Sequence, residues 1–175
     1  MEYKYLHIED ITPDLLDDFD RYEEINRAWR VENGSPCLKE IHYTENWDKA
    51  ELREVSDGLR ETVLNKGAVF AAFDKDILVG FASLEHNFFG SKNQYIQLSM
   101  IHITRNYRCL GIGKVLFELC ANKAKEFGAE KLYISASSCE NGQSFYKKMG
   151  CVAADEINQE LFVLEPYDCH MEFVL

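Results

Sequence analysis

The sequence predicts an α+β domain with three layers (α/β/α), in which helices cover both faces of a mixed, mostly antiparallel sheet. Two observations lead to this fold class. Apolar runs typical of strands recur along the chain, and between them lie segments whose apolar residues repeat at helical spacing. The predicted order is one strand, two helices, three strands, and then helix and strand twice. The 175 residues are enough for one ordinary domain, and we expect residues 1–175 to form it.

The N-terminal part is predicted to contain a strand and a helix. Residues 3–10 alternate in polarity, which is typical of a strand. Thr12 is a suitable helix cap and Pro13 suits the first helical position. Apolar residues continue at helical spacing through Phe19, so we expect a helix that runs towards Ala28.

A second helix is predicted after an interruption. Asn-Gly-Ser-Pro at residues 33–36 breaks the chain, and the pattern from there to about Trp47 favours neither helix nor strand. Helical spacing then returns, and Gly67 marks the expected end of this helix. The residues that carry the spacing are Leu52, Val55, Leu59 and Val63.

Three strands should follow. Residues 68–73 and 77–84 are apolar runs joined by a short polar turn, which indicates a hairpin. Residues 95–103 form a third long apolar run after a polar loop. All three should lie in the core of the sheet.

The last third alternates helix and strand. A helix is expected from about Gly111 to Gly128, followed by a strand at residues 131–136. A short helix should cover residues 141–149, and the alternating residues 170–175 predict a final strand, whose exposed edge would allow a homodimer.

Composition excludes several functional classes. The formal net charge of −11 disfavours nucleic acids and anionic membranes as partners, because both require a positive surface. The chain contains no apolar run of about 18 residues, so we expect no membrane span. Its N-terminus lacks the pattern of a secretory signal, and we expect a cytoplasmic protein. The six cysteines lack metal-ligand spacing, so no metal site is predicted.

One turn between a strand and a helix carries the functional signal. Arg108-Cys109-Leu110-Gly111-Ile112-Gly113 follows the strand at residues 95–103 and precedes Lys114. Glycines let a backbone approach a ligand closely, and the first N–H groups of a helix have no internal partner. The turn therefore suits an anion, with Arg108 and Lys114 as flanking cations. By itself, such a turn is also compatible with a purely structural role.

A second motif, further along the chain, indicates a function for this turn. Glu140-Asn141 precedes Ser144-Phe145-Tyr146-Lys147-Lys148-Met149-Gly150-Cys151. An R-x-x-G-x-G turn after a long strand, followed by a strand and then by N…FYKKMGC, resembles the GNAT-type N-acetyltransferases. The resemblance covers residues 68–155. It implies the acyl-CoA N-acyltransferase fold, whose central strands splay apart, and acetyl-CoA as co-substrate for transfer to an amine acceptor.

The resemblance also implies roles for individual residues. The strand backbone at Ile101, His102 and Ile103 would contact the pantetheine arm. The turn would hold the pyrophosphate, and Asn141 would contact the cofactor nearby. Tyr146 would lie at the cofactor and protonate the departing thiolate, which a phenol suits chemically. The turn residues are Arg108, Cys109, Leu110, Gly111, Ile112, Gly113 and Lys114.

The proton acceptor is a separate question. Relatives carry a glutamate where this chain has Gln97, which cannot take a proton usefully. Glu85 is the preferred candidate, with His86 and His102 as alternatives. Leu110 also replaces an arginine of many relatives, which removes one cation from the turn. Cys109 lacks an activating neighbour, so we expect direct attack by the amine without an acyl-enzyme.

The acceptor is expected to be a small or cationic amine. Aromatic and acidic residues in the early segments and near the C-terminus would suit an amine with apolar bulk. An alternative function is a catalytically silent acyl-CoA-binding sensor, which the absence of a carboxylate at position 97 favours. A third is an interaction protein that has kept only the fold. The candidate pocket residues are Trp29, Glu32, Tyr43, Trp47, Phe88, Phe89, Tyr95 and Glu165.

Overall fold

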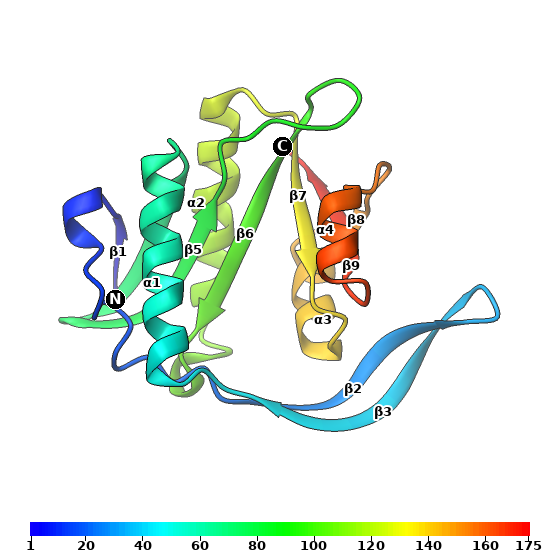
Figure 1. The fold of residues 1–175 in the computed structure, drawn as a ribbon, viewed down its shortest axis with the longest axis horizontal. Helices are drawn as coiled ribbons and strands as arrows, with labels where there is room; N and C mark the ends of the chain where they lie inside the picture. The colour runs from blue at the N-terminus through cyan, green and yellow to red at the C-terminus, as the bar shows by residue number, and fades with distance from the viewer.

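The computed structural model describes residues 1–175 and has a seven-stranded sheet at its centre (Figure 1). All neighbouring strands are antiparallel except one central pair, β6 and β7. The fold class predicted from the sequence is therefore confirmed. In spatial order the strands are β1 (Glu2–Tyr5), β4 (Ala68–Asp74), β5 (Ile77–Leu84), β6 (Tyr95–Ile103), β7 (Lys131–Ala136), β9 (Cys169–Val174) and β8 (Val152–Ala153).

Helices cover both faces of the sheet. α1 (Lys49–Leu64) packs on one face over a cluster of ten buried residues that includes Leu59 and Phe81. α2 (Ile112–Phe127) packs on the other face over a cluster of twenty, and α3 (Glu140–Lys148) adds partly buried side chains to it. Figure 1 shows α1 and the short α4 (Gln159–Leu164) in front of the sheet, with α2 and α3 behind it.

Most predicted elements are present. α1, β4, β5, β6, α2, β7, α3 and β9 match the sequence-based expectations within a few residues. The first strand is shorter than expected and is followed by a 3-10 turn at Ile8–Asp10. The sequence analysis missed α4 and β8. β9 pairs with β7 on one side and with two residues of β8 on the other, so it is not the open sheet edge expected of the last strand.

The predicted helix from Thr12 towards Ala28 was wrong. Residues 13–18 form turns, and β2 (Glu23–Glu32) then pairs with β3 (Ser35–Glu45). The apolar residues of this stretch are buried, as the helical pattern suggested, but some belong to the turns and the others to β2. Pairing of β2 with the next strand, β3, overrides the local helical spacing here.

β2 and β3 form a two-stranded arm, which is the most distinctive element of the fold. Its turn is Asn33-Gly34, whose φ angles of 52° and 77° are those of a tight hairpin turn. Figure 1 shows the arm crossing below β6 and β7 and then extending beyond the rest of the molecule. No helix is both long enough and apolar enough to cross a membrane.

Candidate active site

The central pair of strands separates to leave a gap. β6 and β7 are paired only at Tyr95–Lys131, Ile96–Leu132 and Gln97–Tyr133. Beyond these residues β6 continues to Ile103 beside β5, whereas β7 continues to Ala136 beside β9. The β6 edge that faces β7 is therefore unpaired from Leu98 onward. A bulge at Ser99 adds to the divergence, because pairing with β5 shifts between Leu98 and Met100.

The turn after β6 lies at the open end of this gap. Cys109 and Gly111 have φ angles of 62° and 84°, and Gly111 caps α2 without a side-chain hydrogen bond. None of the six backbone N–H groups from Cys109 to Lys114 has an acceptor within the chain; the next one, that of Val115, bonds to the Gly111 carbonyl. Six free donors at the positive end of a 16-residue helix fit the phosphates of a coenzyme A molecule.

The side chain of Arg108 has a structural role in this loop. Its guanidinium donates to the carbonyl oxygens of Ile103 at 3.0 Å, Tyr22 at 2.8 Å and Arg21 at 3.0 Å. These bonds tie the end of β6 to the segment that leads into β2. The guanidinium is therefore directed at protein carbonyls, and the cation of the turn that remains exposed is Lys114.

The predicted β6 contacts occupy the unpaired part of the strand. Ile101 and Ile103 pack towards α2, whereas His102 lies on the other face against Trp47, with ring centroids 4.8 Å apart. Burial, together with the nearby guanidinium of Arg21, lowers the pKa of His102 to about 3. The imidazole is thus neutral at pH 7 and a weak base.

Tyr146 and Asn141 come from α3, on the β7 side of the gap. The Tyr146 ring packs against the main core cluster, and its hydroxyl makes no hydrogen bond within the chain. Burial raises the pKa of Tyr146 above its ordinary value, and the charge of Asp168 adds a smaller effect in the same direction. A phenol with a raised pKa stays protonated at neutral pH and remains available as a proton donor. Asn141 is exposed in the first turn of α3.

Glu85 lies on the β6 side of the gap, just after β5. Its Oε1 accepts hydrogen bonds from the Ser99 hydroxyl at 2.7 Å and from the Thr62 hydroxyl at 2.9 Å. Its backbone N–H bonds to the Gln97 carbonyl, which fixes its position beside the last paired residue of β6. The second carboxylate oxygen remains free. The alternative base His86 packs edge-on against Phe127, at 4.4 Å between ring centroids.

A second carboxylate, which sequence reasoning missed, lies on the β7 side. The Ser135 hydroxyl donates to Asp168 Oδ2 at 3.1 Å. Burial raises the pKa of Asp168, and the charges of Glu165 and Glu45 add to this effect. Asp168 lies in the turn before β9, where no local motif marks it; only the pairing of β7 with β9 brings it to the gap.

The structure does not gather all eight expected pocket residues at one place. Tyr95 is buried at the closed end of the gap, where it bonds to Glu172, and Glu32 pairs with Lys39 near the tip of the arm. Trp47 is part of the core beneath α1. Tyr43 of β3 is largely exposed. Its partial burial raises its pKa, and the charge of Glu45 adds a smaller effect, so Tyr43 lies close to that carboxylate.

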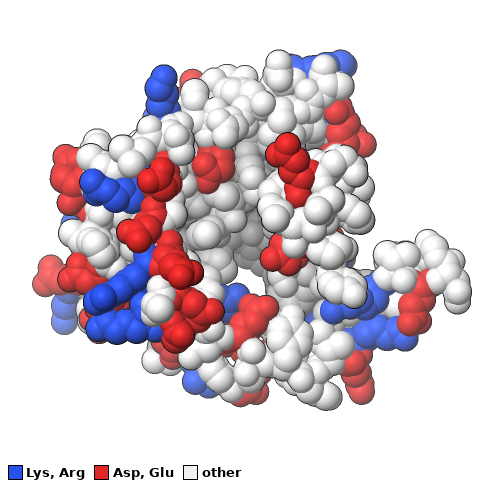
Figure 2. Space-filling view, viewed as in Figure 1, with Lys and Arg blue, Asp and Glu red and all other residues white.

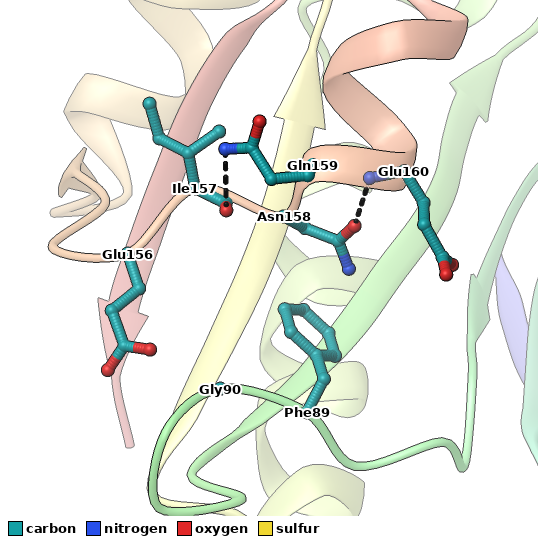
Figure 3. Close-up of a pocket in the computed structure, with 7 residues that line it drawn as sticks. All are labelled: Phe89, Gly90, Glu156, Ile157, Asn158, Gln159 and Glu160. Carbon is teal, nitrogen blue, oxygen red and sulfur yellow. Dashed lines mark hydrogen bonds between the residues drawn. The ribbon is translucent and has the colours of Figure 1, made fainter.

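Two of the surface pockets are relevant to the site. The larger, of about 340 Å³, lies between the β5–β6 loop and the start of α4 (Figure 3). Its polar groups are largely paired: Asn158 caps α4, and Glu156 accepts bonds from Ser91 and Gln94. The smaller, of about 200 Å³, lies between β2 and the start of α3 and includes Asn141. Of the residues predicted from the sequence, Asn141 lines the smaller pocket and Phe89 lines the larger one.

Acidic side chains surround the gap. Figure 2 shows a hollow in the middle of the face seen in Figure 1, with Asp and Glu side chains around it. Ion pairs neutralise several acids of β2, β3 and α3: Arg21 pairs with Glu23 and Glu45, and Arg27 pairs with Glu140. Such a surface attracts a cationic molecule.

Known proteins share this fold. Solved structures that match include nourseothricin acetyltransferase (17% identity, 99% of this chain and 97% of that chain, TM-score 0.70). A proposed streptothricin acetyltransferase from Bacillus anthracis, bound to acetyl coenzyme A, matches with 17% identity over 99% and 98% of the chains and a TM-score of 0.71. The PaiA N-acetyltransferase of Thermoplasma acidophilum, bound to coenzyme A, matches with 16% identity over the whole of both chains and a TM-score of 0.61.

Sequence comparison gives the family. No curated protein sequence matches significantly. The model of the acetyltransferase (GNAT) family, however, matches residues 20–151, which include the turn after β6, Glu85 and Tyr146. Members of this family use acetyl-CoA as co-substrate, and the six free N–H groups beside a parted pair of strands fit that molecule. The chain therefore belongs to the GNAT family of acetyltransferases.

Proposed function

We propose that this protein is an N-acetyltransferase that transfers the acetyl group of acetyl-CoA directly to an amine. The observation that carries the proposal is the combination of six unpartnered N–H groups at residues 109–114 with an unpaired β6 edge beside them. Backbone donors of this kind suit the pyrophosphate, and the strand edge suits the amide groups of the pantetheine arm. In this proposal Asn141 and the backbone at residues 101–103 add further cofactor contacts.

The proposed reaction needs two proton transfers. The amine nitrogen attacks the thioester carbonyl carbon, the carbon–sulfur bond breaks, and the amine proton must leave. We assign the amine proton to Glu85, directly or through water, because its free carboxylate oxygen lies beside the gap. We assign protonation of the departing thiolate to Tyr146, whose hydroxyl is protonated at neutral pH and unengaged. The acidic rim favours a small or cationic amine as acceptor.

Cofactor binding is tested by thermal unfolding with acetyl-CoA, with free CoA and ATP as controls. At a hundredfold excess over the dissociation constant a ligand adds about 2.7 kcal/mol to stability. For a chain of this size that corresponds to a rise of roughly 5–10 °C in Tm. We expect a rise with both CoA species and none with ATP. No rise with acetyl-CoA would contradict the proposal.

The role of Tyr146 is tested by Tyr146→Phe. Loss of a general acid costs about 10²- to 10⁴-fold in rate. We therefore expect kcat to fall by about 10²-fold or more, while the acetyl-CoA-induced rise in Tm is retained. Acetylated amine should be measured by mass spectrometry, because a thiol reagent would also react with the exposed Cys109. An unchanged kcat would remove Tyr146 from the mechanism.

A further inference from the structure

Two serines hold a carboxylate on each side of the gap, and the arrangement is nearly symmetrical. Gln97 and Tyr133 are the last paired residues of β6 and β7. Ser99 and Ser135 each lie two residues further along, after the strands have parted. Ser99 donates to Glu85 at 2.7 Å and Ser135 donates to Asp168 at 3.1 Å. Each carboxylate therefore accepts a hydrogen bond from a serine just beyond the last pair of β6 and β7, one on the β6 side and one on the β7 side.

Neither carboxylate is neutralised within the chain. The ion pairs of the protein engage other acids, and none contains Glu85 or Asp168. Other acids near the same opening differ in this respect, because Glu23, Glu45 and Glu140 are all paired with arginines. Asp168 is half-buried and accepts only the Ser135 hydroxyl. A partly buried carboxylate without a cation is stabilised by any ligand that brings one.

The surroundings of Asp168 favour a positive charge. Glu165 and Glu45 lie close enough for their charges to raise the pKa of Asp168, in addition to the larger effect of burial. The charge of Asp168 also raises the pKa of Tyr146, the proposed acid, so Asp168 lies near the reacting groups. An acceptor with a second cationic group can meet both Glu85 and Asp168.

We propose that Asp168 is a specificity-determining residue that binds a second positive charge of the acceptor, so that the preferred substrates are amines carrying two basic groups. This inference rests on the proposed function. Glu85 remains the proton acceptor for the reacting amine, and Asp168 binds the ammonium group at the other end. Asp168 thereby orients the acceptor across the gap and takes no part in proton transfer.

The test compares diamines with monoamines. 1,3-Diaminopropane to 1,6-diaminohexane and the 1-aminoalkanes of the same lengths are assayed with acetyl-CoA, with product measured by mass spectrometry. A hydrogen bond to a charged group changes affinity by about 10- to 100-fold. We expect at least one diamine to exceed its monoamine by about tenfold or more in kcat/KM. Asp168→Asn should abolish this preference, mainly by raising KM for the diamines, and Asp168→Glu should partly restore it.

Two controls separate the possible failures. Asp76→Asn removes the same charge from an exposed turn and should leave the preference intact. The acetyl-CoA-induced rise in Tm should be the same in Asp168→Asn and in the unchanged protein. Turnover without a preference for diamines, or a preference that survives Asp168→Asn, overturns this inference and leaves the proposed function standing. Failure of the unchanged protein to acetylate any amine overturns both.

Discussion

The role of Arg108 is the sharpest test of how the cofactor loop is built. Sequence reasoning treats it as a cation for phosphate, whereas the structure directs all three donors at carbonyls of residues 21, 22 and 103. Arg108→Ala would leave three carbonyls without this partner. Allowing about 1 kcal/mol for each partly exposed bond, the loss is about 3 kcal/mol. For a chain of 175 residues this lowers Tm by roughly 6–12 °C.

The assay is thermal unfolding of Arg108→Ala, Arg108→Lys and the unchanged protein, each with and without acetyl-CoA. The Lys variant keeps the charge but cannot supply three separately directed donors, so it should lose most of the same stability. We expect both variants to be destabilised without ligand and to keep most of their ligand-induced rise. A normal Tm in Arg108→Ala combined with loss of the ligand effect would refute the reasoning, because that result is expected of a phosphate ligand.

Two further predictions concern the loop and the closed end of the gap. Gly111→Ala should weaken acetyl-CoA binding, as measured by calorimetry. A Cβ at Gly111 would meet no atom within 4 Å, but the left-handed φ of 84° costs a residue with a side chain about 1–2 kcal/mol. Gly128→Ala, at the far end of α2 with a φ of 92°, is the matched control and should lose stability but not affinity for acetyl-CoA. Glu172→Gln should lower the stability, because it removes the charge that pairs with Lys131 at 2.6 Å and leaves Lys131 with only its exposed partner Asp155. Burial alone would raise the pKa of Glu172, but hydrogen bonds from Lys131 and Tyr95 outweigh it and lower the pKa below the ordinary 4.5. The stability that ionised Glu172 contributes is therefore present above about pH 4.5 and is lost as the pH falls through the lowered pKa of Glu172 in the folded protein. Over this pH range Tm should therefore decline less in Glu172→Gln than in the unchanged protein.

Local sequence signals were sufficient for the central part of the fold. The glycines of the turn at residues 108–113 and the apolar spacing of α2 depend only on neighbouring residues, so the cofactor loop could be located from sequence. Tyr146, in contrast, was identified through the resemblance of the motif at residues 144–151 to the GNAT family, and its catalytic role stays a prediction. The role of the Arg108 side chain could not be predicted, because two of its three partners, Tyr22 and Arg21, lie 86 and 87 residues away in the segment before β2.

The errors arise where a segment takes its structure from the strand that pairs with it. Leu16 and Phe19 continue a helical pattern, but the residues after them extend because β3 is available to pair with β2. The Asn33-Gly34 dipeptide is a strong hairpin signal and would have indicated the arm if the flanking residues had been tested for pairing. Asp168 carries no local signal, because its place beside Ser135 follows only from the pairing of β7 with β9.

The arm also sets the width of the gap that it crosses. Beyond Gln97 and Tyr133 no hydrogen bonds between β6 and β7 hold the two halves of the sheet at a fixed separation. β2 joins them instead: Arg108 holds its beginning at Tyr22, and Trp29 bonds to Ser138 beyond β7 at 2.8 Å. The six residues between these anchors make seven steps of about 3.3 Å in an extended chain and so act as a spacer of roughly 23 Å. The size of molecule that fits between the two walls is thus determined by the length of a peptide segment outside the sheet.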